Sequence, residues 1–342
     1  MKKQFIFLSM AFILMAMLFT GISCKSSDTP EEAPIALYSN VEGVVDNPSK
    51  VFFTADISPE GLMAVYKALG REAYGKVGVK ISTGEPGGKH FLAPALIKDL
   101  VREVNGTIVE ANTAYAGKRI NTAMHYLVAK DHGFTAIAPV LILDESGDVS
   151  LPVTNGKHLK EDLVGAHFND FDFHLVLSHF KGHQMGGFGG ALKNMSIGYA
   201  SSSGKILIHS AGKNKTTWGV DRAEQNDFLE SMAEAAKAVV DAAGKDNFIY
   251  INVMNHLSVD CDCNGNPAVP QMADIGILAS LDPVALDKAC LDLVYAASDS
   301  KALIERIESR NGALTVDHAE TLGLGSTKYE LINIDNVLPP SK

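Results

Sequence analysis

The chain has 342 residues, of which 46% are hydrophobic, 20% charged and only 7% aromatic. This composition is typical of a globular protein with a substantial core, and it excludes a disordered chain, a disulfide-stabilised miniprotein and a polytopic membrane protein. The formal net charge is −10. Because domains that bind nucleic acid usually carry a basic surface, we expect no nucleic-acid partner.

The N-terminal segment has the pattern of a targeting signal and not of a part of the folded domain. Lys2 and Lys3 precede an uncharged apolar run that is short for a membrane span, and small residues then lead to Cys24. This order resembles the lipobox of bacterial lipoproteins. It predicts a signal peptide at 1–23, lipidation of Cys24 and a polar tether over 24–45. The alternatives are an ordinary signal peptide with an incidental cysteine, or an uncleaved anchor. We expect a protein of the bacterial cell envelope that contacts the membrane through its lipid alone.

Strand and helix patterns alternate along residues 46–338. Strands are predicted at 51–53, 76–82, 107–111, 173–178, 248–254, 275–279 and 329–334. Helices are predicted from Ser58-Pro59, at 94–104, 121–131, from Gly190, at 227–243, 282–297 and 301–309. The alternation predicts an α/β fold, with one or more mainly parallel sheets and helices on both faces. A division into two lobes would fall near residues 168–171.

In open parallel sheets, ligands bind beyond the carboxyl ends of the strands, so the loops that follow strands are the candidate sites. The first such loop is Lys80–His90, which holds three glycines between cationic residues. It is suited to an anionic ligand at a helix N-terminus, with Lys80, Glu85 and Lys89 as binding candidates. The alternative is a solvated Gly/Pro turn.

The second loop, Ser178–Asn194, carries two histidines, two lysines and five glycines directly after an apolar strand. Glycines allow close backbone approach to an anion, and histidines transfer protons or ligate metals. The catalytic candidates are His179, His183 and Lys181, and the binding candidates are Gly186, Gly187, Gly189, Gly190, Lys193 and Asn194. The segment lacks the P-loop pattern. The alternative is a flexible surface loop.

The third loop, Asn255–Gly265, places two thiols and a histidine close together in the sequence. Thiolates and imidazole suit a transition metal, with Cys261, Cys263 and His256 as the ligands. The spacing is C-x-C rather than the C-x₂-C of common zinc sites. The alternatives are a disulfide from Cys261 or Cys263 to Cys290, and inert buried cysteines.

These loops resemble the bacterial and archaeal domain of unknown function 362 family, often labelled uncharacterised iron–sulfur centre proteins. The matching strings lie at 80–86, 112–119, 178–194, 198–210, 260–263 and 269–287. The resemblance covers roughly residues 77–294 and implies an α/β body whose activity is unassigned. The family is in turn distantly similar in fold to lactate racemase, and fold alone does not fix function.

The resemblance also bears on the cofactor. Many members of the family carry a ferredoxin-like insertion with cysteine-rich cluster motifs after the position of Ser210. This chain has no cysteine between Ser210 and Asn255, so we expect no iron–sulfur cluster.

Two hypotheses follow. In the first, the protein is a redox or isomerase-type enzyme that holds a transition metal or an anionic cofactor at these loops. In the second, it is a non-catalytic surface protein that binds a small anionic molecule.

Overall fold

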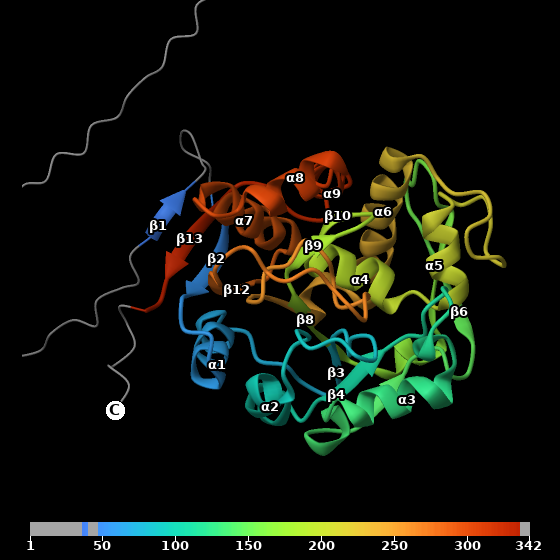
Figure 1. The fold of residues 1–342 in the computed structure, drawn as a ribbon, viewed down its shortest axis with the longest axis horizontal. Coiled ribbons are helices and arrows are strands. Elements are labelled where there is room, and N and C mark those ends of the chain that lie inside the picture. Colours follow the sequence, from blue (N-terminus) through green and yellow to red (C-terminus); the bar gives the residue numbers. More distant parts are fainter. Residues whose placement is uncertain (1–35, 40–46, 336–342) are drawn as a thin grey trace, which may run out of the picture. The chain divides into compact units, whose positions relative to one another are not determined.

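The computed structural model of the protein describes residues 36–39 and 47–335. Within these residues, nine strands form one sheet, drawn as arrows in Figure 1. In spatial order they are β1 (Ala36–Ser39), β13 (Tyr329–Asn333), β2 (Ser49–Thr54), β12 (Gly276–Ser280), β11 (Phe248–Met254), β8 (Phe173–His179), β3 (Val77–Lys80), β4 (Thr107–Glu110) and β5 (Val140–Ile142). Two hairpins lie outside this sheet: β6 (Asp148–Pro152) with β7 (Glu161–Gly165), and β9 (Lys181–His183) with β10 (Gly187–Gly189).

The main sheet is mainly parallel, as predicted. Neighbouring strands from β11 through β8, β3 and β4 to β5 run parallel, and so do β13 and β2. β12 is antiparallel to both of its neighbours, and β1 is antiparallel to β13. Because β12 pairs directly with β11 in the opposite direction, the connection 255–275 begins and ends at the same end of these two strands. The third candidate loop therefore stays at the carboxyl end of β11.

The helices begin and end close to their predicted bounds. They are α1 (Pro59–Ala68), α2 (Pro94–Glu103), α3 (Thr122–Asp131), α4 (Ala191–Tyr199), α5 (Ser202–His209), α6 (Gln225–Ala243), α7 (Pro283–Ala296), α8 (Lys301–Ser309) and α9 (Leu314–Thr321). The Ser58 side chain caps α1 by accepting a hydrogen bond from the N–H of Gly61, and Asp282 caps α7 in the same way. The helices α5 and α9 and the short strand β5 were not predicted.

Helices cover both faces of the sheet because strand residues alternate between two cores. In β8, Leu175 and Leu177 belong to the core that contains α1 and α2, whereas Val176 belongs to the core that contains α4, α6 and α7. β11 alternates in the same way. Figure 1 shows the two groups of helices on opposite sides of the strands. This confirms the predicted α/β class.

The order of the strands fixes where a crevice forms. Along the chain, β4 and β5 follow β3 on one side, and β8 and β11 are then added on its other side. At such a reversal, loops leave neighbouring strands toward opposite faces and leave a crevice at their carboxyl ends. The described residues all belong to one compact unit, and residues 166–170 form a short 3₁₀ helix within it.

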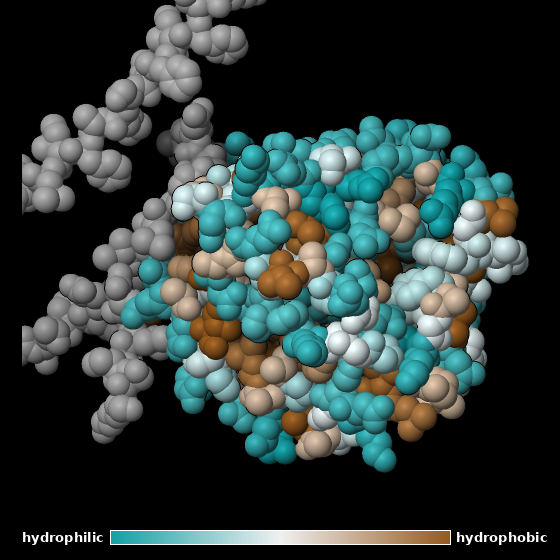
Figure 2. Space-filling view, in the orientation of Figure 1, coloured by the Kyte–Doolittle hydropathy of each residue, from teal (hydrophilic) through white to brown (hydrophobic). Residues whose placement is uncertain are grey.

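The predicted signal peptide, Cys24 and most of the tether lie outside the described residues. Among the helices that the structure describes, none combines the length and apolar character needed to cross a membrane. The face drawn in Figure 2 is mainly hydrophilic, with hydrophobic residues scattered among polar ones. Isolated exposed hydrophobic residues are ordinary on a protein surface.

Candidate functional site

A cavity of about 330 Å³ lies at the predicted edge of the sheet. Lys80 ends β3, Glu110 ends β4 and His179 ends β8, and all three line the cavity. Cys261 and Cys263 line it from the connection after β11. The structure therefore brings together residues from all three loops that the sequence singled out.

Positive charge dominates the described lining of this cavity. Five cationic side chains contribute to it: Lys80, Arg119, Lys181, Lys193 and Lys205. Two carboxylates, Glu110 and Asp262, face them. The protein as a whole is acidic, so this local excess of cations is a property of the cavity and not of the chain.

Glu110 organises the wall beyond β3 and β4. Its carboxylate accepts hydrogen bonds from Lys80 Nζ at 3.1 Å, from an Arg119 nitrogen at 3.1 Å and from the N–H of Thr83 at 2.8 Å. Glu85 accepts from Arg119 at 2.8 Å and from the hydroxyl of Tyr115 at 2.8 Å. Lys80, Glu85, Glu110, Tyr115 and Arg119 together are named the Glu110 cluster. Its charges are paired and its side chains have fixed positions.

The electrostatics of Glu110 follow from these contacts. Burial alone would raise the pKa of this carboxyl, but the charges of Lys80 and Arg119 outweigh burial and hold the pKa far below its usual value. Burial lowers the pKa of Lys80, and the charge of Glu110 opposes that effect. The cluster is therefore a mutually dependent set of buried ions.

Asp262, between the two cysteines, organises another part of the wall. Its carboxylate accepts from Lys181 Nζ at 2.8 Å and contacts Nδ1 of His179 at 2.8 Å. The other nitrogen of His179 lies 2.7 Å from the backbone oxygen of Asn255, which can only accept. Burial would raise the pKa of Asp262, but His179 and Lys181 lower it to about 2. His179 and Lys181 thus hold the cysteine loop, and both nitrogens of His179 are used in doing so.

Lys193 and Lys205 differ from the other cations of the cavity. Within the described residues, Nζ of Lys193 has no hydrogen-bond or ion-pair partner. Burial and the nearby cations Lys80 and Arg119 lower the pKa of Lys193 to about 8. Lys205 donates only to the backbone oxygen of Ala200, and burial lowers its pKa to about 8 as well. These two cations are not neutralised by a paired carboxylate.

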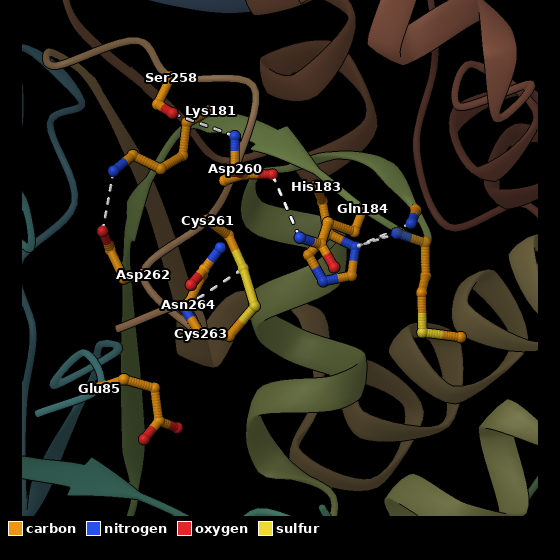
Figure 3. Close-up of a disulfide and its surroundings, with 12 residues drawn as sticks. Glu85, Lys181, His183, Gln184, Ser258, Asp260, Cys261, Asp262, Cys263 and Asn264 are labelled. Atoms are coloured by element: carbon orange, nitrogen blue, oxygen red, sulfur yellow. Dashed lines mark hydrogen bonds and ion pairs between the residues drawn. A yellow bond between two sulfur atoms is a disulfide. The ribbon is translucent and has the colours of Figure 1, made fainter. Parts of the chain in front are cut away.

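A disulfide joins Cys261 and Cys263 at the cavity wall (Figure 3). Cys290 is buried in the core and is not bonded to another cysteine. The alternative pairing of Cys261 or Cys263 with Cys290 is therefore wrong, because Cys290 lies on α7 among apolar residues away from the cavity lining.

The structure also tests the predicted metal ligands. His183, rather than His256, offers a ligand atom within 4.8 Å of those of Cys261 and Cys263. His256 is exposed and its ring lies beside that of His90, so its predicted place in the set is wrong. Nδ1 of His183 accepts a hydrogen bond from the N–H of Gly186 at 2.8 Å.

This geometry restricts metal binding. A backbone N–H can only donate, so in a neutral His183 the hydrogen sits on Nε2 and that nitrogen cannot ligate a metal. A disulfide sulfur is in turn a poor ligand, because metals bind the thiolate. The three residues are a candidate ligand set, but their state in this structure does not fit a metal.

Other predicted binding residues have structural partners or lie elsewhere. Lys89 is exposed and is not part of the cavity lining, which contradicts its predicted role. Glu85 also lies outside the lining, because its carboxylate is bound to Arg119 and Tyr115. Asn194 lines the cavity and donates from Nδ2 to the backbone oxygen of Lys80 at 3.1 Å, which joins α4 to the end of β3.

The glycines of the second loop serve backbone approach rather than an anion. Gly189 and Gly190 line the cavity, whereas Gly186 and Gly187 do not. The N-terminus of α4 is already occupied, because Asp287 accepts hydrogen bonds from the N–H groups of Ala191 at 2.8 Å and Leu192 at 2.9 Å. A Cβ at Gly190 would lie 2.3 Å from a carboxylate oxygen of Asp287, so glycine is required for this contact.

Sequence reasoning missed several residues of the cavity. Glu110, Arg119, Lys205 and His209 all line it, and none was chosen as a site residue. The available signal was the family resemblance, because Arg119, Lys205 and His209 lie within its matching strings. Trp218, the single tryptophan of the chain, also lines the cavity and lies beside the rings of His209 and Tyr115.

The fold and the site define the class of this protein: an open, mainly parallel α/β protein with a cation-lined cavity beyond the carboxyl ends of its strands. Residues 77–292 match the family described as Domain of unknown function (DUF362), and the chain belongs to this family. The resemblance noted in the sequence is thereby confirmed. A search of curated proteins gives no match.

Several solved structures are similar to the chain, including these two. One is the lactate racemase apoprotein from Thermoanaerobacterium thermosaccharolyticum, with 15% identity, a TM-score of 0.36, and coverage of 64% of this chain and 54% of that one. The other is a protein from Thermotoga maritima, with 17% identity, a TM-score of 0.40, and coverage of 68% and 57%. The chain thus spans little more than half the length of either protein. Similarity at this level does not bear on the activity of this chain.

Proposed function

We propose that the protein is an enzyme that binds a small organic anion in the cavity, with Lys193 as the group that transfers a proton. The observation that carries the proposal is the ammonium group of Lys193, which has no partner among the described residues, in a cavity where the carboxylates already have partners. A partly buried charge without a partner is costly, and an anionic ligand would reduce that cost. Lys205, which has only a backbone acceptor, would be the second contact.

The size and lining of the cavity support an organic anion rather than a bare ion. A volume of about 330 Å³ is at the lower end of the range for small-molecule sites. Trp218, Tyr115 and Ile197 provide an apolar wall for the uncharged part of such a molecule. The cations would hold a carboxylate or phosphate group, with Asn194 and Ser178 as neighbouring polar groups.

Lys193 is also suited to acid–base chemistry. A general acid or base works best when its pKa lies near the working pH, and burial together with nearby cations brings the pKa of Lys193 to about 8. An ordinary exposed lysine is almost fully protonated at neutral pH, whereas this one can both donate and accept a proton. The alternative, a binding protein without turnover, would use the same cations for charge alone.

The first experiment measures binding. Isothermal titration calorimetry with benzoate and phenyl phosphate should detect binding, and benzamide, the uncharged analogue of benzoate, should bind more weakly. Lys193→Gln should weaken binding of the anions by roughly tenfold, the value of one hydrogen bond to a charged group. Lys89→Gln removes the same charge outside the cavity and is the matched control. Equal affinity for benzoate and benzamide would contradict the proposal.

A second experiment separates an enzyme from a binding protein. Ligands that bind are incubated with the protein in D₂O, and NMR follows deuterium entry at their carbon atoms. Lys193→Arg keeps the charge but not the accessible neutral form, so it should retain binding and lose exchange. No exchange in the native protein with any bound ligand would favour the non-catalytic alternative.

We also propose that the protein is a lipid-anchored component of the bacterial cell envelope. The support is the order of Lys2 and Lys3, the apolar run, the small residues and Cys24. Expression of the full chain with labelled palmitate tests the anchor. Label that is present in the native chain and lost in Cys24→Ser is the expected result, and label retained in the variant would contradict it.

A further inference from the structure

We infer that Cys261 and Cys263 are a redox-active pair that exchanges with a thiol entering the cavity, and that His183 stabilises the departing sulfur by donating a hydrogen bond from Nε2. The chemical class of substrate is a small thiol that carries a negative charge. The preference for an anionic thiol rests on the proposed function, because it depends on the cations of the cavity. The exchange itself does not depend on that proposal.

The first support is that this disulfide contributes little to holding the fold together. A disulfide stabilises mainly by closing a loop in the unfolded chain, and the gain grows with the length of the loop. Here the two cysteines are separated by one residue, so the gain is near its minimum. The pair instead lines the cavity, whereas Cys290 is buried in the core. Position and loop length both favour a chemical role over a structural one.

The second support is that the loop is held by contacts that do not involve the sulfur atoms. The side chain of Asp262 binds Lys181 and His179, and its backbone oxygen accepts from the N–H of Glu85 at 2.8 Å. Asp260 contacts Arg306 at 3.2 Å on the other side of the pair. Figure 3 shows Asp260 and Asp262 beside the disulfide, with Lys181 next to Asp262. Both sulfurs would therefore remain at the cavity wall after reduction.

The third support is the orientation of His183. Its Nδ1 accepts from the backbone N–H groups of Met185 and Gly186, so the neutral ring carries its hydrogen on Nε2. A ring nitrogen of His183 lies within 4.8 Å of both sulfur atoms. The ring is thus fixed as a hydrogen-bond donor beside the pair, and a hydrogen bond to the departing thiolate makes it a better leaving group.

The exchange takes two steps, each of which is an attack by a thiolate on a disulfide. A thiolate RS⁻ attacks Sγ of Cys263, the less buried of the two cysteines, and the Cys261–Cys263 bond breaks as the RS–Cys263 bond forms. Cys261 leaves as a thiolate, which accepts a hydrogen bond from Nε2 of His183. A second thiolate attacks the mixed disulfide and releases RSSR and the thiolate of Cys263. The two protons given up by the two thiols protonate Cys261 and Cys263. In total, two RSH are oxidised to RSSR and the protein disulfide is reduced to two thiols.

The test begins with thiol counting in the folded full chain. The protein is equilibrated with mixtures of reduced and oxidised glutathione, alkylated, digested and analysed by mass spectrometry. Cys261 and Cys263 should gain two labels together as the mixture becomes more reducing, while Cys290 stays unlabelled until the chain is unfolded. Cys290→Ser is the matched control and should give the same titration. A pair that stays oxidised under dithiothreitol, or stays reduced in air, would overturn the inference.

Two further measurements separate the parts of the inference. Exchange with 2-mercaptoethanesulfonate should be at least about tenfold faster than with neutral 2-mercaptoethanol, after correction for thiolate fraction, because the cations concentrate anions in the cavity. Lys193→Gln should reduce this ratio, and Lys89→Gln should not. Equal rates for the two thiols would overturn the anionic preference and count against the proposed function, while the redox pair would stand.

The role of His183 has its own readout. His183→Ala should slow exchange by roughly tenfold, the value of one hydrogen bond to a charged group, whereas His183→Gln, which keeps a side-chain N–H donor, should lose less of the rate. An equally large loss in both variants would overturn this role. Zinc bound at one equivalent to the reduced protein, with both thiols protected from alkylation, would assign the pair to a metal and would also overturn the inference.

Discussion

The two sides of the cavity treat charge in opposite ways. In the Glu110 cluster, each buried ion meets an ion of opposite sign, as Glu110 does with Lys80 and Arg119. On the side of α4 and α5, Lys193 is half-buried and Lys205 is buried, and neither has a paired carboxylate among the residues that the structure describes. Both sides contribute lysines to the same cavity. The difference shows that the presence of a lysine says less about function than whether its charge is already neutralised.

This contrast has a physical basis. Neutralised buried ions fix positions, and removing one partner leaves the other unpaired in a medium of low polarity. Ions that are not neutralised raise the energy of the empty site and bind a ligand of opposite charge. We therefore expect substitutions in the Glu110 cluster to reduce stability, and substitutions of Lys193 or Lys205 to reduce ligand binding.

The largest expected effect is a loss of stability when the Glu110 cluster is changed. Glu110→Ala leaves Lys80 and Arg119 buried without their shared carboxylate and should lower the free energy of unfolding by about 3–5 kcal/mol. Urea denaturation followed by circular dichroism measures this loss. Glu103→Ala, at an exposed position on α2, is the control and should change stability by less than about 0.5 kcal/mol. A loss below about 1 kcal/mol for Glu110→Ala would show that the two cations find other partners.

The second expected effect concerns Lys193, where a substitution should weaken ligand binding without reducing stability. Lys193→Met removes a cation that has no partner in the described part of the chain and lies near Lys80 and Arg119, so it should not reduce stability. The same change should weaken the binding of benzoate by about tenfold. Calorimetry and urea denaturation on the same variant give both values. A loss of stability comparable to that of Glu110→Ala would contradict the distinction between the two sides.

A smaller effect concerns pH. The protonated form of Lys193 binds the anion, and its pKa is lowered to about 8, so affinity should fall as pH rises above 8, by at most about tenfold per unit. Below that value the affinity should be nearly constant. Calorimetric titrations over a series of pH values test this, with Lys193→Met expected to lose the dependence on Lys193.

The lowered pKa of Lys193 also makes the stability of the protein without ligand depend on pH. Between the folded pKa of about 8 and the ordinary value of 10.5, the unfolded chain binds more protons at Lys193 than the folded chain does. Stability should therefore rise with pH across this interval, and Lys193→Met should reduce that rise. An unchanged slope in the variant would contradict the lowered pKa.

Much of the fold could be predicted from the sequence because local signals and burial agree. The Ser58-Pro59 start of α1 and the Asp282-Pro283 start of α7 follow from capping geometry alone. The apolar runs that form β8 and β11 are buried on both faces, as parallel strands require. By contrast, α5 is short and follows α4 almost directly, so no strand or turn signal separates it. The antiparallel β12 also could not be read from its apolar run, because pairing direction depends on the connection.

The site was less predictable because it depends on which charges meet in space. Position after a strand correctly brought Lys80, His179 and Cys261 to one cavity. It could not show that Asp287, far along the chain, occupies the N-terminus of α4, nor that Lys89 lies outside the cavity lining. The partner of a charged residue determines whether that residue is free to bind a ligand, and partners distant in sequence leave no local pattern.

The smallest expected effect concerns Glu85, and it decides whether this residue binds the ligand or only positions Arg119 and Tyr115. The sequence predicted that Glu85 binds the cofactor, whereas in the structure its Oε1 accepts from Arg119 and Tyr115. Glu85→Gln keeps an oxygen that can accept both hydrogen bonds and removes one negative charge beside Arg119. Stability should fall by about 1 kcal/mol, and affinity for benzoate should rise slightly, up to about twofold, because the cavity becomes more positive. Calorimetry on this variant, with Lys89→Gln as control, measures the change. A tenfold loss of affinity would instead show that Glu85 contacts the ligand, and the paired side of the cavity would then bind as well as position.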